Sequence, residues 1–230
     1  MKPLNNYMSK NILIVGASGL VGGEILKNLK TTNNDLILLS RKKLLCENSI
    51  NQIVIDFENI DSLDASLKVD EIYIAIGQKL SLSELVYIKK NNRKSFVNVD
   101  YNYIKKVAEF AKNCGASSIG LISAIGANTK SLNTYLKVKG NVEQEIKLVG
   151  YKKIIIAHPS HLFGKRAGED IPMTVKVFEQ ITNLFGLLMI GPLQKFRNVE
   201  AKKVAKAIIS KMDSVEEGIH YIDYKYFKNF

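Results

Sequence analysis

Residues 11–23 have the sequence NILIVGASGLVGG, a short apolar run that leads directly into a glycine-rich turn. The run Asn11–Val15 is typical of a parallel strand buried on both faces, because it is apolar after its first residue and rich in β-branched side chains. Glycines follow at positions 16, 19 and 22, and residues 20–30 have the apolar spacing of a helix. This strand, loop and helix together predict a site for nucleotide phosphates.

Each glycine of the G-x-x-G-x-x-G pattern has its own expected task. Gly16 permits the tight turn out of the strand, Gly19 lets the backbone approach a pyrophosphate, and Gly22 lets the helix pack closely on the sheet. The free N–H groups and the positive dipole end of the helix complete the phosphate site. A tight turn without a ligand is the alternative. The predicted cofactor-binding residues of this segment are Gly16, Ser18, Gly19, Leu20, Val21 and Gly22.

Apolar strands and amphipathic helices alternate along the rest of the chain. Further strands are expected at residues 36–40, 52–57, 71–77, 118–123, 153–158 and 218–223. Helices are expected at residues 97–114, 135–149, 172–187 and 199–212. The alternation predicts an α/β fold with a doubly wound, mainly parallel Rossmann sheet of about six to seven strands flanked by helices. With no break in composition, residues 1–230 are expected to form a single domain, in which residues 160–195 add a small substrate-side lobe.

The end of the second expected strand bears on the choice of cofactor. An acidic residue there would accept a hydrogen bond from the ribose 2′-hydroxyl of NAD, whereas this chain has Ser40 and Arg41. A guanidinium suits a 2′-phosphate, so NADP(H) is favoured over NAD(H), and an ordinary exposed basic turn is the alternative. Asp56 and Phe57 are expected at the adenine, and Gly77 would let the backbone pass close to the cofactor's ribose.

A serine, a tyrosine and a lysine follow in an order that predicts catalysis. The fifth expected strand ends at Ser123, and Tyr135 and Lys139 come later, four residues apart on one face of a helix. A nearby ammonium favours the phenolate, so Lys139 is expected to lower the pKa of Tyr135 from about 10 towards neutral. Tyr135 would then act as general acid or base on a carbonyl or alcohol, with Ser123 donating a hydrogen bond to the same oxygen. Lys139 would also hold the nicotinamide ribose.

Four segments carry a resemblance to a known family. They are GASGLVGG at 16–23, VDYNYIKKVAEFAKNCGASSIGLISAIGAN at 99–128, YLKVKGNVEQEI at 135–146 and HPSHLFGKR at 158–166. In this order they resemble the short-chain dehydrogenase/reductase superfamily, and more narrowly its atypical NAD(P)-binding branch of Tat-interacting-protein (CC3)-like proteins and their bacterial relatives. The resemblance places Ser123, Tyr135 and Lys139 at the family's catalytic positions.

The resemblance also concerns the segment after the sixth expected strand. It implies that four consecutive residues approach the nicotinamide: Pro159, Ser160, His161 and Leu162. His158 stands where relatives more often carry an arginine. Asn98 falls near the helix asparagine with which the superfamily supports its active-site lysine through water.

These features predict an NADP(H)-dependent oxidoreductase that transfers a hydride to or from a small carbonyl or alcohol substrate. Two alternatives stay open, a non-catalytic NADP(H)-binding regulatory protein and a sugar-nucleotide epimerase-like enzyme. The chain is short for the second alternative, because such enzymes usually carry a larger C-terminal lobe.

The net charge of +11 does not by itself indicate a partner. Residues 1–100 have a net charge of +2 and residues 101–230 one of +9, mostly on expected helix faces, and no nucleic-acid-binding module accompanies it. We therefore expect a small-molecule substrate and no nucleic acid, with a homodimer as an open option. The longest apolar runs are too short to cross a membrane, so no membrane partner is expected. Cys46 and Cys114 lie far apart, so no metal site is predicted, and with a polar N-terminus they suit a cytoplasmic protein.

Overall fold

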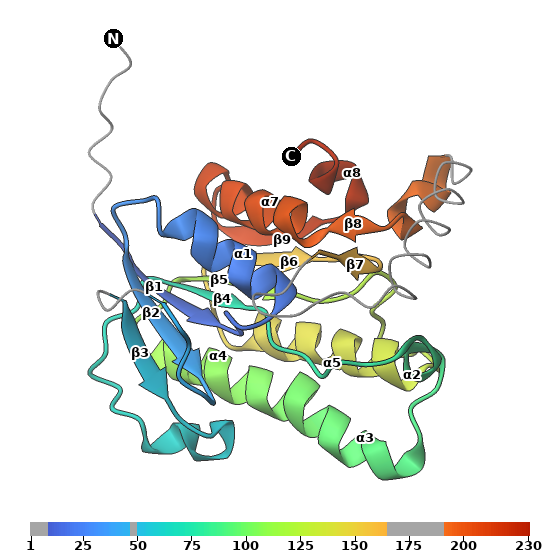
Figure 1. The fold of residues 1–230 in the computed structure, drawn as a ribbon, viewed down its shortest axis with the longest axis horizontal. Coiled ribbons are helices and arrows are strands. Elements are labelled where there is room, and N and C mark those ends of the chain that lie inside the picture. Colours follow the sequence, from blue (N-terminus) through green and yellow to red (C-terminus); the bar gives the residue numbers. More distant parts are fainter. Residues whose placement is uncertain (1–8, 47–49, 165–190) are drawn as a thin grey trace.

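The computed structural model describes residues 9–46, 50–164 and 191–230 (Figure 1). Its largest element is a sheet of seven parallel strands in the order β3-β2-β1-β4-β5-β6-β9. The strands are β1 (Asn11–Val15), β2 (Asp35–Ser40), β3 (Asn51–Val54), β4 (Glu71–Ile74), β5 (Ser118–Ile122), β6 (Lys153–Ala157) and β9 (Gly218–Ile222). The prediction of a doubly wound, mainly parallel Rossmann sheet of about six to seven strands is confirmed.

Helices cover both faces of this sheet (Figure 1). One face carries α1 (Leu20–Leu29) and α7 (Ala201–Ser214), and the other carries α4 (Ile104–Asn113) and α5 (Thr134–Leu148). Successive residues of β1 pack towards opposite layers: Ile12 and Ile14 join the core beneath α1 and α7, and Leu13 and Val15 join the core of α4 and α5. The apolar run of β1 is therefore buried on both faces, as in other parallel sheets.

Shorter elements connect these layers. They are η1 (Phe57–Ser62), α2 (Leu82–Val86), α3 (Lys90–Val97), η3 (Gly191–Phe196), α8 (Tyr224–Phe227) and a small sheet of β7 (Leu162–Phe163) and β8 (Val199–Glu200). Between α3 and α4 the chain forms a π-helix, η2 (Asn98–Tyr103). The single helix expected at residues 97–114 is therefore wrong in two respects: the helical segment begins at Lys90, and it contains a wider turn.

Other expected bounds also shift for local reasons. The strand expected at 52–57 ends at Val54, because Asp56 caps η1 and accepts a hydrogen bond from the Glu58 N–H. The helix expected at 199–212 begins at Ala201, since the two preceding residues pair with β7. The helix expected at 172–187 lies outside the described residues, as does most of the lobe expected at 160–195.

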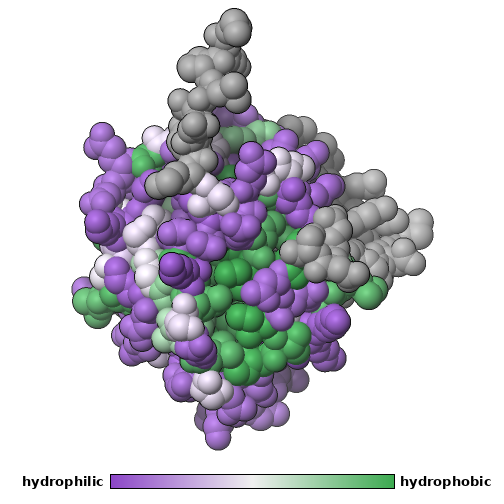
Figure 2. Space-filling view, turned by 90° about the vertical axis from the view of Figure 1, so that its left-hand side faces the viewer, coloured by the Kyte–Doolittle hydropathy of each residue, from purple (hydrophilic) through white to green (hydrophobic). Residues whose placement is uncertain are grey.

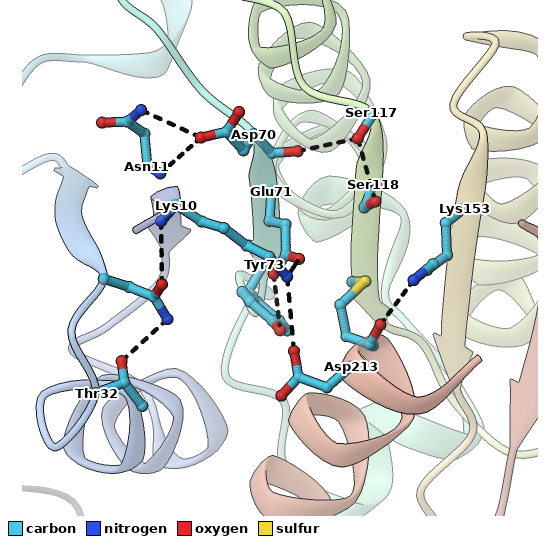
Figure 3. Close-up of polar contacts among 12 residues, drawn as sticks. Lys10, Asn11, Thr32, Asp70, Glu71, Tyr73, Ser117, Ser118, Lys153 and Asp213 are labelled. Carbon is cyan, nitrogen blue, oxygen red and sulfur yellow. Dashed lines mark hydrogen bonds and ion pairs between the residues drawn. The ribbon is translucent and has the colours of Figure 1, made fainter. Parts of the chain in front are cut away.

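The two edges of the sheet differ in chemistry. Where the strands begin, polar side chains form a cluster (Figure 3) in which Lys10 Nζ lies 2.5 Å from Glu71 Oε1 and Lys153 Nζ donates to the Met212 carbonyl at 2.9 Å. Where they end, the chain order reverses between β1 and β4, and the glycine loop leaves β1 at this point. In doubly wound folds, ligands bind in the crevice at that second edge.

The surface of the molecule carries both polar and apolar areas. The edge strand β3 lies on the left in Figure 1, and the face on that side shows hydrophobic side chains among hydrophilic ones (Figure 2). Val54 of this strand and Leu45 before it are exposed. Within the described residues, no helix is long and apolar enough to cross a membrane.

Candidate cofactor cleft and active site

The glycine loop is pressed against the end of β4. Gly16 has a φ of +94°, and a Cβ there would lie 2.6 Å from the Ala75 carbonyl oxygen. A Cβ on Gly22 would lie 2.1 Å from the Gly16 carbonyl oxygen, so α1 starts close behind the loop. Gly19 N–H donates to the Gly16 carbonyl at 2.9 Å and precedes the first helical residue. The backbone around Gly16 and Gly22 leaves no room for side chains, and the helix start can receive an anion.

A cleft opens beside this loop at the carboxyl ends of β1, β2 and β4. Its lining residues are Gly16, Ser18, Gly19, Leu39, Ser40, Arg41, Phe57, Ala75, Ile76, Gly77, Val99 and Tyr103. Seven of these were predicted to bind the cofactor: Gly16, Ser18, Gly19, Ser40, Arg41, Phe57 and Gly77. Phe57 is 2% exposed and meets the Tyr103 ring edge-on, with ring centres 5.7 Å apart. A backbone cradle, an aromatic wall and an exposed guanidinium fit the phosphates and adenosine of a dinucleotide.

Four other predicted cofactor-binding residues of the loop and of η1 do not line the cleft. Val21 is buried in the core beneath α1, and Gly22 is packed against the loop backbone. Asp56 uses its carboxylate to cap η1. Leu20 is half-buried, with its side chain near Gly164.

Tyr135 and Lys139 lie one turn apart on α5, which begins after the N-cap residue Asn133. Lys139 is 6% exposed, and its Nζ lies 2.9 Å from Asp100 Oδ1. Asp100 is 1% exposed, and its other oxygen accepts a hydrogen bond from the Gln78 N–H at 2.7 Å. A Cβ on Gly77 would lie 3.1 Å from Asp100 Oδ1, so this glycine makes room for the ion pair beside the cleft.

Sequence reasoning missed Asp100. It pointed instead to Asn98, whose side chain donates to Glu58 at 3.5 Å and accepts from Asn102 at 2.7 Å. The π-helix changes the turn at this point, and such turns are frequent at functional sites. The available signal was spacing: Asp100 comes three residues before the buried Tyr103 and seven before the buried Val107.

Lys139 lowers the pKa of Tyr135 as expected, but the net shift of that pKa is upward. Burial raises the pKa of Tyr135, and the attraction of the Lys139 ammonium is opposed by the Asp100 carboxylate, so the pKa of Tyr135 stays above its usual value. Burial by itself would lower the pKa of Lys139, but Asp100 outweighs it and the pKa of Lys139 is raised. At neutral pH the Tyr135 phenol is therefore neutral, and the charge of the Lys139 ammonium is compensated by the Asp100 carboxylate.

Ser123 is bound to a residue that the sequence analysis did not select. Its hydroxyl donates to Glu143 Oε1, and the same oxygen lies 2.8 Å from His158 Nε2. Glu143 is 5% exposed and follows Lys139 by four residues, which was the only available signal. In this arrangement the proton of Ser123 is directed to Glu143, and His158 partners the carboxylate.

A second cavity of about 330 Å³ lies beside Tyr135. It is lined by Leu85, Ala124, Ile125, Tyr135, Leu136, Pro159, Ser160, His161, Phe196 and Asn198. Three of the four residues expected near the nicotinamide line it, whereas Leu162 pairs with Val199 in the small sheet. Among the described residues, no group of three or more His, Cys, Asp or Glu side chains gathers as a metal site would require.

Sequence comparison with curated proteins identifies relatives of this chain. The rat protein HTATIP2 is 31% identical over 165 residues, which are 69% of this chain and 65% of the rat protein. The mitochondrial protein FMP52 of Lodderomyces elongisporus is 30% identical over 176 residues, which are 69% of each chain. The matched part thus spans slightly less than two thirds of HTATIP2. No protein-family model matches the chain.

Solved structures share the fold at low sequence identity. MoeE5 in complex with UDP-glucose and NAD superposes with a TM-score of 0.68 and 12% identity, over 94% of this chain and 79% of that one. Thermoplasma acidophilum aldohexose dehydrogenase superposes with a TM-score of 0.69 and 16% identity, over 94% and 93%. These likenesses show that the chain shares the Rossmann-like fold of these proteins.

The prediction of a cytoplasmic location is wrong by the same comparison. The FMP52 relatives from Candida albicans, Lodderomyces elongisporus and Debaryomyces hansenii are all named mitochondrial. The features used for the prediction, a polar N-terminus and two distant cysteines, do not distinguish the cytosol from other compartments.

Proposed function

The chain belongs to the family that contains HTATIP2 and the FMP52 proteins, and from that premise we propose that it is an NADP(H)-dependent oxidoreductase that reduces a small carbonyl substrate. The observation that carries the proposal is the position of Tyr135, which lines a cavity one helical turn from the buried Lys139–Asp100 ion pair. Gly77, which makes room for this ion pair, lines the cofactor cleft.

The residues of the cleft divide the work of holding the cofactor. Gly16, Ser18 and Gly19 would receive the pyrophosphate, and Phe57 would pack on the adenine. Arg41, which lines the cleft with Ser40, would pair with the 2′-phosphate of NADP(H). When bound there, NADP(H) supplies the hydride, as nicotinamide cofactors do.

Tyr135 would act as the general acid. Because its pKa is raised, its hydroxyl carries a proton at neutral pH and can give it to a carbonyl oxygen on which negative charge develops. The Lys139 ammonium then stabilises the phenolate left behind, and Asp100 keeps that ammonium charged and in place. A phenol that carries its proton can serve as the acid of carbonyl reduction, and its phenolate would serve as the base of the reverse reaction.

The cofactor assignment is tested by titrating NADPH and NADH into the wild type and the Arg41→Ala variant. A charged hydrogen bond contributes about 1.5–3 kcal/mol, so the variant should bind NADPH about 10–100 times more weakly and NADH equally well. Lys43→Ala is the matched control, because Lys43 is exposed on the same basic turn and does not line the cleft. Equal binding of both cofactors by the wild type, with no effect of Arg41→Ala, contradicts the assignment.

The chemical role is tested with Tyr135→Phe in a carbonyl reductase assay. Loss of a positioned general acid should reduce kcat by about 10²–10⁴-fold while NADPH binding persists. Tyr87→Phe, at an exposed tyrosine, should leave the rate unchanged. A wild type that binds NADPH tightly and turns over no carbonyl would point to the non-catalytic regulatory alternative.

A further inference from the structure

We infer that the cavity beside Tyr135 receives a neutral, largely apolar carbonyl compound rather than a sugar nucleotide or another anionic substrate. This inference rests on the proposed function, because it names the substrate class of the same site. It depends on three properties of the cavity: its walls, its few polar groups and its rim.

The walls of the cavity are apolar and come from separate parts of the chain. Leu85 lies in α2, Leu136 in α5 directly after Tyr135, and Pro159 two residues after β6. Ala124 and Ile125 complete the wall after β5. Apolar walls around a single reactive hydroxyl are typical of sites that bind by burial and orient the ligand by one polar contact.

The polar groups that the described residues contribute to the cavity offer no permanent charge to a ligand. Among the described lining residues, none is a lysine, arginine, aspartate or glutamate. The Ser160 hydroxyl donates to the Arg197 carbonyl, and the Arg197 guanidinium lies 5.8 Å from the centre of the Tyr224 ring. Lys195 does not line the cavity, although its Nζ lies 5.2 Å from the centre of the Phe196 ring. A diphosphate or a carboxylate seated among the described lining residues would therefore lose its hydration without gaining a charged partner from them.

The rim of the cavity contains an exposed aromatic residue. Phe196, the last residue of η3, is 45% exposed although it lines the cavity. Leu193 on the same 3₁₀-helix is 55% exposed and does not line it. An apolar ligand would cover part of the Phe196 ring, and this burial adds to its affinity.

The test measures the binding of methyl ketones to the protein saturated with NADP⁺, in which no reduction can occur. Each buried methylene contributes about 0.8 kcal/mol, so the Kd should fall about fourfold per added methylene from 2-butanone to 2-octanone. Glyoxylate and UDP-glucose are the anionic probes, and we expect both to bind at least about 100-fold more weakly than 2-octanone. A Kd independent of chain length, preferred binding of either anion, or no binding of any ketone overturns the inference.

The Phe196→Ala variant localises the effect, with Leu193→Ala as its matched control. Phe196→Ala should raise the Kd of 2-octanone about tenfold and leave that of 2-butanone nearly unchanged, whereas Leu193→Ala should change neither. The same ketones are then offered with NADPH. Chain-length-dependent binding without turnover overturns the oxidoreductase proposal and leaves the inferred ligand class standing. Turnover without chain-length dependence overturns the inferred ligand class and leaves the oxidoreductase proposal standing.

Discussion

Asp100 controls the charge of the active site through one contact. Without Asp100, burial would lower the pKa of Lys139 and favour its neutral amine. If Lys139 kept its charge, the ammonium would lower the pKa of Tyr135 and favour the phenolate. With Asp100, the pair is neutral overall and the phenol keeps its proton. One buried carboxylate thus adds to the effect of burial and opposes the effect of Lys139 on the pKa of Tyr135.

Replacing Asp100 by Asn should change both stability and the pH dependence of the rate. The buried Lys139 loses its partner, so the free energy of unfolding should fall by about 3–5 kcal/mol. Reduction by the wild type should persist through neutral pH and decline only as the raised pKa of Tyr135 is passed. Because the Asp100 charge raises that pKa, its removal should move the decline to lower pH. Urea titration and the pH profile of kcat/KM measure the two effects.

An exposed pair of similar length provides the control for Asp100→Asn. Lys106 Nζ lies 2.8 Å from Asp61 Oδ2, and the Asp61 side chain is 76% exposed. Asp61→Asn should cost no more than about 1 kcal/mol and leave the pH profile unchanged. Equal losses in the two variants, or an unshifted profile in Asp100→Asn, would contradict the role of Asp100.

The residues of the site differ in how far the sequence predicts them. Ser123, Tyr135 and Lys139 are recognisable because they follow a glycine loop and a fifth strand in a fixed order. Asp100 and Glu143 are carboxylates on helices, and such residues are almost always solvated, so nothing but their spacing to buried neighbours marks them. The contacts of these two acids with Lys139 and Ser123 therefore had to come from the structure.

At the scale of the element, the glycine loop and the start of α1 are packed so closely at Gly22 that a side chain there would clash with the loop. The Cβ of an alanine at Gly22 would lie 2.1 Å from the Gly16 carbonyl oxygen, which is backbone and cannot rotate away. Gly22→Ala should therefore cost at least about 3 kcal/mol and weaken NADPH binding, because the loop that cradles the phosphates must move. Thermal unfolding and NADPH titration measure both losses.

Gly23→Ala is the control in the next position of the same helix. Its Cβ would lie 3.2 Å from the Ala17 carbonyl oxygen, which asks for a shift of a few tenths of an ångström. Alanine also gains about 1 kcal/mol of helix propensity over glycine. The stability of Gly23→Ala should therefore stay within about 1 kcal/mol of the wild type. Similar behaviour of the two variants would show that the Gly22 contact does not govern the loop.

Elements with a regular apolar period follow from the sequence, and irregular ones do not. The inner strands of the large sheet were recognised because each is a short, largely apolar run buried on both faces, as in β1 and β5. The π-helix Asn98–Tyr103 leaves no mark in a 3.6-residue period, since it changes the turn and not the composition. Strands β7 and β8 have two residues each, too few for any period.

At the scale of the whole molecule, the cofactor cleft and a polar cluster that affects stability lie at opposite ends of the strands. The cofactor cleft lies where the strands end, and the cluster around Glu71 lies where they begin (Figure 3). Glu71 is 5% exposed, and its Oε1 lies 2.5 Å from Lys10 Nζ. The Tyr73 hydroxyl donates to Glu71 Oε2 at 3.5 Å. Substitutions at this edge should therefore change the free energy of unfolding and leave the Kd of NADPH unchanged.

Replacing Glu71 and replacing Lys10 should lower the free energy of unfolding by unequal amounts. The Lys10 side chain is 36% exposed and also lies 3.7 Å from Asp213, so after Glu71→Gln it keeps contact with water and a second carboxylate. Glu71→Gln should thus cost less than about 1 kcal/mol. Lys10→Met instead leaves the buried carboxylate without its cation, and should cost about 2–3 kcal/mol, less than for a fully buried pair.

The pH dependence of that difference identifies its cause. Burial alone would lower the pKa of Lys10, but Glu71 outweighs it, so the pKa is raised above its ordinary value of 10.5. A raised amine pKa gives stability that is fully present below pH 10.5 and is lost as the pH rises through the folded-state pKa. The excess stability of the wild type over Lys10→Met should therefore be constant near neutral pH and shrink above it in urea titrations. A difference that persists at high pH would mean that the alkyl chain of Lys10, and not its charge, stabilises this edge.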